Sequence, residues 1–329
     1  MNKTIAVTGA SGHLGNVVCR LLCEKGYRVK AFQHTNSAGL EGLPIEIIKG
    51  DILNKDDLAR LIDGCDIVIN SAAIISINGD PTGIVFKTNT EGPRNVLEVS
   101  RNKGVKRVIH ISSVHAVMEE PLSEAFVEKR TYKNPSCFTY DYSKAQGEQF
   151  MLKESEKRNP EVVVLRPSCI IGPYDFKPSE FGTALIKFYN QKIPAMPEGG
   201  YNFIDVRDVA ESVINAIDKG KNGEVYLATG KYKTMTEIAN VIHTVTGKKT
   251  PRTILPYRFL KSLLPFISLY SKITKTKPQF TIESINALKY GHPHMVNTKA
   301  ISDLGHNCRP FEESIKDFYN WQKTNNRIN

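Results

Sequence analysis

The sequence has no Cys-x-x-Cys pair, no run of about 18 consecutive apolar residues and no motif that reads nucleic-acid bases. Its six cysteines are scattered, and Cys19 and Cys23 lie four residues apart on one expected helix, where a disulfide has poor geometry. These absences argue against a disulfide scaffold, a membrane-spanning segment and a nucleic-acid-binding protein. They predict a reduced, cytoplasmic protein.

The composition is that of an ordinary soluble protein. The 329 residues are 40% hydrophobic and 24% charged, and the chain is long enough for one large domain or one domain with a smaller lobe. The formal net charge is +10. One interpretation of this charge is a solvated basic surface, and the other is a field that favours an anionic cofactor or an anionic membrane surface.

Short apolar runs alternate with helical patterns up to residue 228, and no internal repeat is present. The strands expected are residues 5–7, 28–33, 45–49, 66–70, 105–112, 161–166 and 225–228. The helices expected between them are residues 14–25, 55–62, 90–101, 140–158, 183–191 and 208–219. After residue 230 the pattern is helical, with breaks expected at Pro251, Pro256, Pro265 and Pro278.

This alternation predicts an α/β fold with a doubly wound parallel sheet and a smaller, mostly helical C-terminal lobe. We expect a dinucleotide-binding, Rossmann-type domain in residues 1–172, to which residues 201–229 return. Residues 173–200 and 230–329 then form a substrate-binding lobe.

A glycine-rich turn follows the first expected strand. Gly9, Gly12 and Gly15 are spaced by three residues, with an apolar strand before them and a helical stretch after them. Glycines let the backbone approach a pyrophosphate closely, and a helix N-terminus offers unpaired N–H groups and a partial positive charge. The turn therefore predicts a dinucleotide site.

A second constellation follows the expected fifth strand. Tyr140 and Lys144 lie four residues apart, on one face of an expected helix. An ammonium group at that distance favours the phenolate, so we expect Lys144 to lower the pKa of Tyr140 and make it an acid–base group. Ser112 and Ser113 end the strand, at the edge of the sheet where ligands bind.

In this order, these motifs resemble those of the extended short-chain dehydrogenases/reductases, and the resemblance covers most of the chain. The nearest likeness is to dihydroflavonol 4-reductase-like and 3β-hydroxysteroid dehydrogenase-like enzymes. It rests on the segments Thr8–Gly15, Asp51–Ile52, Asn70–Ala73, Asn89–Asn95, Leu165–Ser168, Ile171–Pro173, Phe203–Ala210 and Val296–Trp321.

The resemblance implies roles for individual residues. It assigns catalysis to Ser113, Tyr140 and Lys144, supported by Asn89, with Ser113 preferred over a structural Ser112. It implies that NAD(P)H gives a hydride to a carbonyl carbon while Ser113 holds the oxygen and Tyr140 protonates it. Beyond Tyr140 and Lys144, the residues expected to bind the cofactor are Gly9, Ser11, Gly12, His13, Leu14, Gly15, His34, Asp51, Ile52, Ala72, Ala73, Pro167 and Ser168.

The end of the second expected strand bears on the choice of dinucleotide. NAD enzymes usually carry a carboxylate there, and residues 31–36 contain none. His34 stands where an arginine is common in the family, and Ser11, Thr35 and Asn36 are available for a 2′-phosphate. We therefore expect NADP, with NAD as the alternative.

The irregular second half bears on the substrate. Sugar-nucleotide enzymes of the family commonly carry an arginine for the diphosphate where this chain has Tyr201-Asn202, although Arg207 and Arg252 lie in the same half. This favours an apolar or phenolic ketone as small-molecule substrate. A sugar-nucleotide epimerase or dehydratase and a non-catalytic NADP sensor are the alternatives, and the expected assembly is a monomer or homodimer.

Two further segments leave alternatives. Residues 255–277 are apolar with interspersed basic residues, which suggests a lid over the substrate lobe or, as the alternative, an interfacial helix on anionic lipid. His292 and His294 flank Pro293, and we interpret them as a loop that binds no metal.

Overall fold

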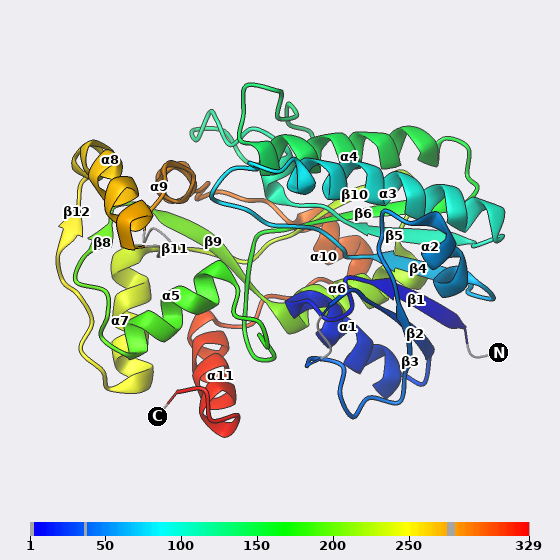
Figure 1. The fold of residues 1–329 in the computed structure, drawn as a ribbon, viewed down its shortest axis with the longest axis horizontal. Helices are drawn as coiled ribbons and strands as arrows, with labels where there is room; N and C mark the ends of the chain where they lie inside the picture. The colour runs from blue at the N-terminus through cyan, green and yellow to red at the C-terminus, as the bar shows by residue number, and fades with distance from the viewer. Residues whose placement is uncertain (1–2, 36–37, 275–279, 329) are drawn as a thin grey trace.

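A seven-stranded parallel sheet forms the centre of the larger domain in the computed structural model, which describes residues 3–35, 38–274 and 280–328 (Figure 1). Its spatial order is β10-β6-β5-β4-β1-β2-β3, and every neighbouring pair is parallel. The strands are β1 (Thr4–Thr8), β2 (Arg28–Gln33), β3 (Glu46–Lys49), β4 (Ile67–Asn70), β5 (Arg107–Ile111), β6 (Glu161–Pro167) and β10 (Val225–Ala228). The order reverses between β1 and β4, and sheets of this type bind their ligands at the carboxyl ends of the strands at such a reversal.

Helices cover both faces of this sheet, as the apolar runs predict. One face packs against α1 (His13–Glu24), α6 (Val206–Lys219) and α10 (Thr298–Leu304). The other packs against α2 (Lys55–Ile62), α3 (Ile84–Asn102) and α4 (Thr139–Ser155). Along β1, Ile5 and Val7 enter the first core and Ala6 the second, in keeping with the two-residue period of a strand.

The smaller lobe contains its own sheet and core. A three-stranded sheet has the order β11-β9-β7, and β8 (Met196–Pro197) pairs with β12 (Ile254–Leu255). The other elements are β7 (Cys169–Ile171), β9 (Gly200–Asp205), β11 (Lys231–Thr234), α5 (Glu180–Tyr189), α7 (Met235–Thr246), α8 (Tyr257–Thr274), α9 (Ile282–Lys289) and α11 (Phe311–Thr324). A third apolar core lies between α5, α7 and α11. Among the described helices, none is both long enough and apolar enough to cross a membrane.

The predicted fold class is confirmed, and several details of the predicted elements are wrong. Helix α4 ends at Ser155 rather than residue 158, and α5 begins at Glu180 rather than residue 183. Helix α3 begins at Ile84 rather than residue 90, because the Asp80 carboxylate accepts hydrogen bonds from the amides of Val85 and Phe86 and so supports an earlier start. Pro265 lies inside α8 instead of breaking it. A proline removes one backbone donor, and here the helix continues past it while Leu260 is buried and α8 packs against α9.

Residues 275–277 of the segment considered as a lid or interfacial helix lie outside the described residues, as do Asn36 and Pro278. The rest of that segment is β12 followed by the single helix α8.

Candidate active site

The glycine turn between β1 and α1 leaves no room for side chains. A Cβ on Gly9, whose φ is +65°, would lie 2.7 Å from the backbone of Ser71 and Ala72, after β4. A Cβ on Gly15 would lie 2.1 Å from the carbonyl oxygen of Gly9. Only glycine fits either place, so the turn brings the start of α1 directly against the ends of β1 and β4.

The N-terminus of α1 has the features of an anion site. Helix α1 begins at His13 and follows Gly12. All residues of this helix are described; no side chain caps its N-terminus, and its first turn contains no acidic residue. Its first N–H groups and its dipole are therefore available to a phosphate. This backbone cradle fits the pyrophosphate of a dinucleotide, and the predicted ligands Gly9, Gly12 and Gly15 lie in it.

Polar contacts join this turn to the loop after β7. The His13 Nε2 atom lies 2.9 Å from the Pro173 carbonyl oxygen. The Asn16 side-chain amide donates to the carbonyl oxygens of Gly12, at 2.7 Å, and Tyr174, at 3.1 Å. The loop of the smaller lobe is thereby fixed beside the anion site. The sequence analysis did not predict these hydrogen bonds of Asn16.

The residues predicted near the adenosine half of the cofactor lie at the ends of β2 and β3. His34 Nε2 is 3.9 Å from the Asp51 carboxylate, and the His34 side chain is 70% exposed. The Asp51 carboxylate also accepts the amide hydrogen of Leu53, at 2.9 Å. The buried Ile52 lies under Gly92 of α3, where a Cβ would approach it at 3.1 Å.

The ends of β1, β4 and β5 are linked by side chains. Thr8 Oγ1 donates to Asn70 Oδ1 at 2.7 Å and accepts from the Ala72 amide at 3.2 Å, while Asn70 Nδ2 lies 3.1 Å from His110 Nδ1. All of these residues except Ala72 are buried. The chain of contacts runs from the glycine turn to the strand that precedes Ser113.

Ser113, Tyr140 and Lys144 come together beyond the end of β5. Tyr140 is hydrogen-bonded to Ser113, whose side-chain oxygen also accepts from the His115 amide at 3.1 Å and caps the short 3₁₀ helix η1 (Val114–Ala116). Lys144, one turn along α4, is buried and donates from Nζ to the Ile111 carbonyl oxygen at 2.7 Å. A phenol, a hydroxyl and an ammonium therefore meet at one edge of the sheet.

The electrostatics of this group differ from the prediction. Burial raises the pKa of Tyr140, the hydrogen bond from Ser113 lowers it, and the first effect is larger. The expectation that Lys144 makes the phenol acidic is wrong in this structure, because the ammonium is directed to the Ile111 carbonyl and the phenol is buried. Burial also lowers the pKa of Lys144 itself, to about 8, against the opposing charge of Glu148.

Asn89 is one step removed from the phenol. Its Oδ1 accepts from the Ile74 amide at 2.9 Å, and its Nδ2 donates to the Ile74 carbonyl at 2.9 Å and to Ser143 Oγ at 3.0 Å. Ser143 in turn donates to the Tyr140 carbonyl oxygen at 2.7 Å. Asn89 thus ties the loop after β4 to α4 and sets the position of Tyr140 through Ser143.

The segment after β6 contributes an unpaired hydroxyl. Ser168 Oγ is buried and has no hydrogen-bond partner among the described residues, which suits a polar group of a bound cofactor. Just before it, the buried Arg166 guanidinium makes a bidentate ion pair with Glu148 of α4, and Tyr132 donates to the same carboxylate at 2.8 Å. This ion pair holds β6 against α4, which carries Tyr140 and Lys144.

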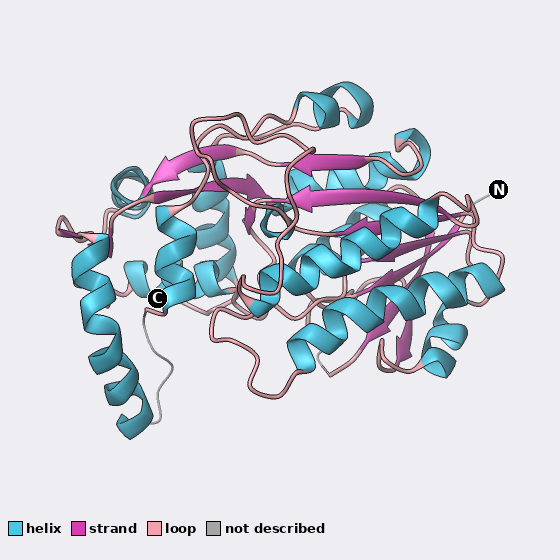
Figure 2. Cartoon of the chain, turned by 90° about the horizontal axis from the view of Figure 1, so that it is seen from above, coloured by secondary structure: helices cyan, strands magenta, loops and turns pink. Residues whose placement is uncertain are grey.

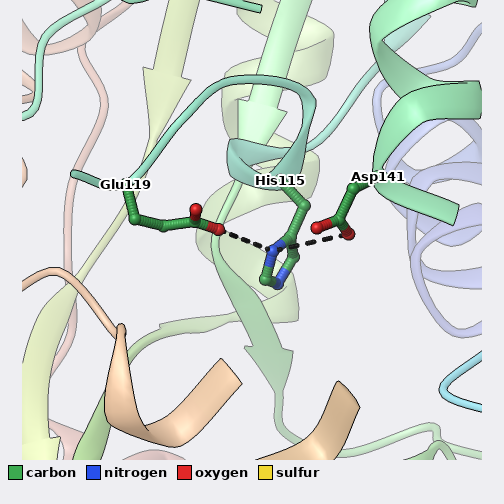
Figure 3. A group of neighbouring side chains, drawn as sticks. All are labelled: His115, Glu119 and Asp141. Atoms are coloured by element: carbon green, nitrogen blue, oxygen red, sulfur yellow. Dashed lines mark ion pairs between the residues drawn. The ribbon is translucent and has the colours of Figure 1, made fainter. Parts of the chain in front are cut away.

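The sequence analysis did not predict a charged cluster that contains His115, Glu119 and Asp141 (Figure 3). The cluster lies beside Tyr140, whose ring centre is 6.4 Å from that of His115. His115 Nδ1 lies 3.3 Å from Glu119 and 3.8 Å from Asp141, and Lys133 contacts both carboxylates. The other ring nitrogen of His115 meets the Tyr201 hydroxyl. The i,i+4 spacing of His115 and Glu119, two residues after Ser113, is the one signal of this cluster in the sequence.

Groups of opposite charge are paired within the cluster. Burial lowers the pKa of His115, but the Asp141 and Glu119 carboxylates outweigh it and raise the value overall. The pKa of Glu119 falls to about 2, because the charges of His115 and Lys133 outweigh the effect of burial. The spacing of His115, Glu119 and Asp141 would suit a cation, and the Lys133 ammonium already supplies that charge.

Comparisons with known proteins identify the family and the fold. The model of the NAD dependent epimerase/dehydratase family matches residues 5–228. A sterol demethylase protein B of Methylococcus capsulatus is 30% identical, over 88% of this chain and 89% of its own length. A putative dihydroflavonol 4-reductase of Synechocystis is 28% identical, over 96% and 93%. The crystal structure of gox2253 matches all of both chains with a TM-score of 0.86 and 27% identity.

Proposed function

The chain belongs to the NAD dependent epimerase/dehydratase family, and from this membership we propose that it reduces a ketone or aldehyde by hydride transfer from a nicotinamide dinucleotide. The observation that carries the proposal is the meeting of Ser113, Tyr140 and Lys144 at the carboxyl edge of the sheet, linked by side chains to the glycine turn. Reductases among the relatives, such as the dihydroflavonol 4-reductase-like protein, support this chemistry.

The residues of the chain have distinct parts in the reaction. The glycine turn and the start of α1 would hold the pyrophosphate, and the bound cofactor would supply the hydride. The Ser113 hydroxyl donates to the carbonyl oxygen, which fixes the substrate. The Tyr140 hydroxyl then gives its proton to the same oxygen as charge develops there. The phenol is protonated at neutral pH, so Tyr140 carries the proton that reduction requires.

Replacing the phenol tests the assignment. In Tyr140→Phe we expect kcat for NADPH-dependent reduction to fall by about 10²–10⁴-fold, the contribution typical of a general acid, while NADPH binding stays nearly unchanged. Tyr142→Phe is the matched control, since Tyr142 lies on the same helix and stacks on Phe86 instead of contacting Ser113. Consumption of NADPH with a panel of apolar ketones and aldehydes gives the readout. An undiminished rate in Tyr140→Phe would remove Tyr140 as the acid.

We propose NADP as the cofactor. The described residues at the end of β2, Gln33, His34 and Thr35, offer no carboxylate to the ribose of NAD, and His34 is exposed at the place of a 2′-phosphate. Tighter binding of NADPH than of NADH, with the difference reduced in His34→Ala, is the expected result. Tighter binding of NADH would overturn this choice and leave the proposed hydride transfer intact.

We propose an apolar or phenolic carbonyl compound as the substrate class. Tyr201 stands where sugar-nucleotide enzymes carry an arginine, and its hydroxyl is directed to His115. Arg207, the arginine next in sequence, is paired with Asp205 and Asp317. The alternative, a sugar-nucleotide epimerase, would convert its substrate without net consumption of NADPH, so the same absorbance assay separates the two activities.

A further inference from the structure

Helix α8 exposes four large apolar side chains on one side, with the exposed Ser262 between the first two. Phe259, Phe266, Leu269 and Ile273 have relative exposures of 50%, 70%, 58% and 72%. Their spacings of seven, three and four residues place them on one side of the helix. Leu260, on the other side, is 1% exposed and anchors the helix to the lobe. The four exposed apolar side chains are therefore not part of a hydrophobic core among the described residues.

The sequence around this face is basic, although the Glu198 carboxylate accepts a hydrogen bond at 2.8 Å from the Tyr257 amide, at the start of α8. Residues 238–282 contain eight lysines and arginines and no aspartate or glutamate. Arg258 and Lys261, both exposed on α8, lie beside the apolar face by helical position. A basic rim beside an exposed apolar stripe is the pattern of a helix that lies in the plane of a membrane surface. A second copy of the chain would bring the same basic rim against itself.

The position of α8 allows such a contact. It lies at the end of the smaller lobe farthest from the parallel sheet (Figure 1), and it is the long helix that extends to the lower left in Figure 2. It packs against α9, and Glu283 at the start of α9 accepts a hydrogen bond from the backbone of Gly79, in the loop after β4. Helix α8 is thus connected through α9 to the loop after β4, which borders the candidate active site.

We propose that the α8 face, consisting of Phe259, Phe266, Leu269 and Ile273 with Arg258 and Lys261, binds the surface of an anionic lipid bilayer. The apolar side chains enter the boundary between headgroups and acyl chains, and the basic residues contact the headgroup phosphates. This contact would place the substrate lobe on a bilayer from which an apolar carbonyl compound can be taken up. The binding itself does not depend on the reaction that the enzyme catalyses.

Co-sedimentation of the full chain with vesicles tests the proposal. We expect binding to vesicles of phosphatidylcholine with phosphatidylglycerol at low salt, and at least tenfold weaker binding in high salt or to phosphatidylcholine alone. Phe266→Ser with Ile273→Ser, and separately Arg258→Gln with Lys261→Gln, should each weaken binding at least tenfold. Ile301→Ser, at another exposed apolar residue, and Lys219→Gln, at another exposed lysine, are the matched controls and should bind as the unmodified chain does.

Three outcomes would overturn the proposal. The first is no sedimentation with anionic vesicles at low salt, and the second is equal binding by the α8 variants and the controls. The third is a concentration-dependent dimer, seen by light scattering, that the Phe266→Ser and Ile273→Ser changes abolish, because the face would then belong to a second copy. Retained NADPH binding shows that each variant is folded, and failure of the proposed reductase activity would leave the vesicle result unaffected.

Discussion

The charge of Lys144 should control how tightly the cofactor binds. Lys144 is buried, its ammonium donates to the Ile111 carbonyl oxygen at 2.7 Å, and burial lowers its pKa to about 8. A dinucleotide is anionic, so it binds the protonated form in preference to the neutral amine. Raising the pH from 7 to 9.5 therefore removes a charge from the site before an ordinary lysine would begin to titrate.

The magnitude follows from the titration of one group. With a pKa of about 8, Lys144 is about 90% protonated at pH 7 and about 3% protonated at pH 9.5. If only the protonated form binds, the Kd for NADPH rises about 30-fold, equivalent to about 2 kcal/mol. The same shift acts on stability in the opposite sense. Between pH 8 and 10.5 the unfolded chain holds the Lys144 proton and the native chain does not. The free energy of unfolding therefore increases with pH in this range, because the buried lysine destabilises the native chain less once it is neutral.

Fluorescence titration with NADPH across this pH range gives the measurement. Lys144→Met keeps the length of the side chain and removes the charge, so its Kd should be weaker at pH 7 and nearly independent of pH. Tyr140→Phe, in which Lys144 remains, should keep the pH dependence of the unmodified enzyme. A flat profile in the unmodified enzyme, or the same slope in Lys144→Met, would refute the assignment of the charge to Lys144.

Two further changes test how the site is held together. Glu148→Gln leaves the buried Arg166 guanidinium without its carboxylate, so it should lower the free energy of unfolding, measured by urea denaturation, by about 3–5 kcal/mol. The control Glu98→Gln, in the exposed pair with Lys55, should change the free energy of unfolding by less than about 1 kcal/mol. Equal losses in the two variants would contradict the importance of burial. Gly15→Ala places a Cβ 2.1 Å from the Gly9 carbonyl oxygen. The Kd for NADPH, measured by calorimetry, should therefore rise more than tenfold. An unchanged Kd would show that the turn is not closely packed.

The parts of the fold that the sequence predicts are those whose signal is local. Strands β2 and β10 and helix α2 begin and end at the predicted residues, because apolar runs and polar punctuation mark them directly. The glycine turn is equally readable, since its spacing and its place between strand and helix both lie within a dozen residues. The early start of α3 is different, because it depends on the Asp80 side chain reaching forward to two amides.

The contacts within the charged cluster beside Tyr140 could not be predicted from the sequence. Tyr201, on β9, meets His115, 86 residues earlier in the chain, and Lys133 comes from the loop before α4. No periodicity or spacing relates these residues, and only the packing of the smaller lobe against the end of β5 brings them together. These contacts beside the phenol therefore depend on tertiary packing, which the sequence does not show.

For Tyr140, the spacing predicted the position of Lys144 on the helix correctly but predicted the direction of the pKa shift of the phenol wrongly. Spacing put the ammonium of Lys144 one helical turn from the phenol, and the structure keeps it there, yet Nζ is directed to the Ile111 carbonyl and burial dominates both groups. A phenol that holds its proton is a competent donor to a carbonyl oxygen and a poor base toward an alcohol. Burial therefore leaves Tyr140 protonated at neutral pH, as an ordinary phenol is, but makes it a weaker proton donor than a phenol with a lowered pKa would be. Oxidation of the alcohol would require the phenolate and should gain relative to reduction as pH rises.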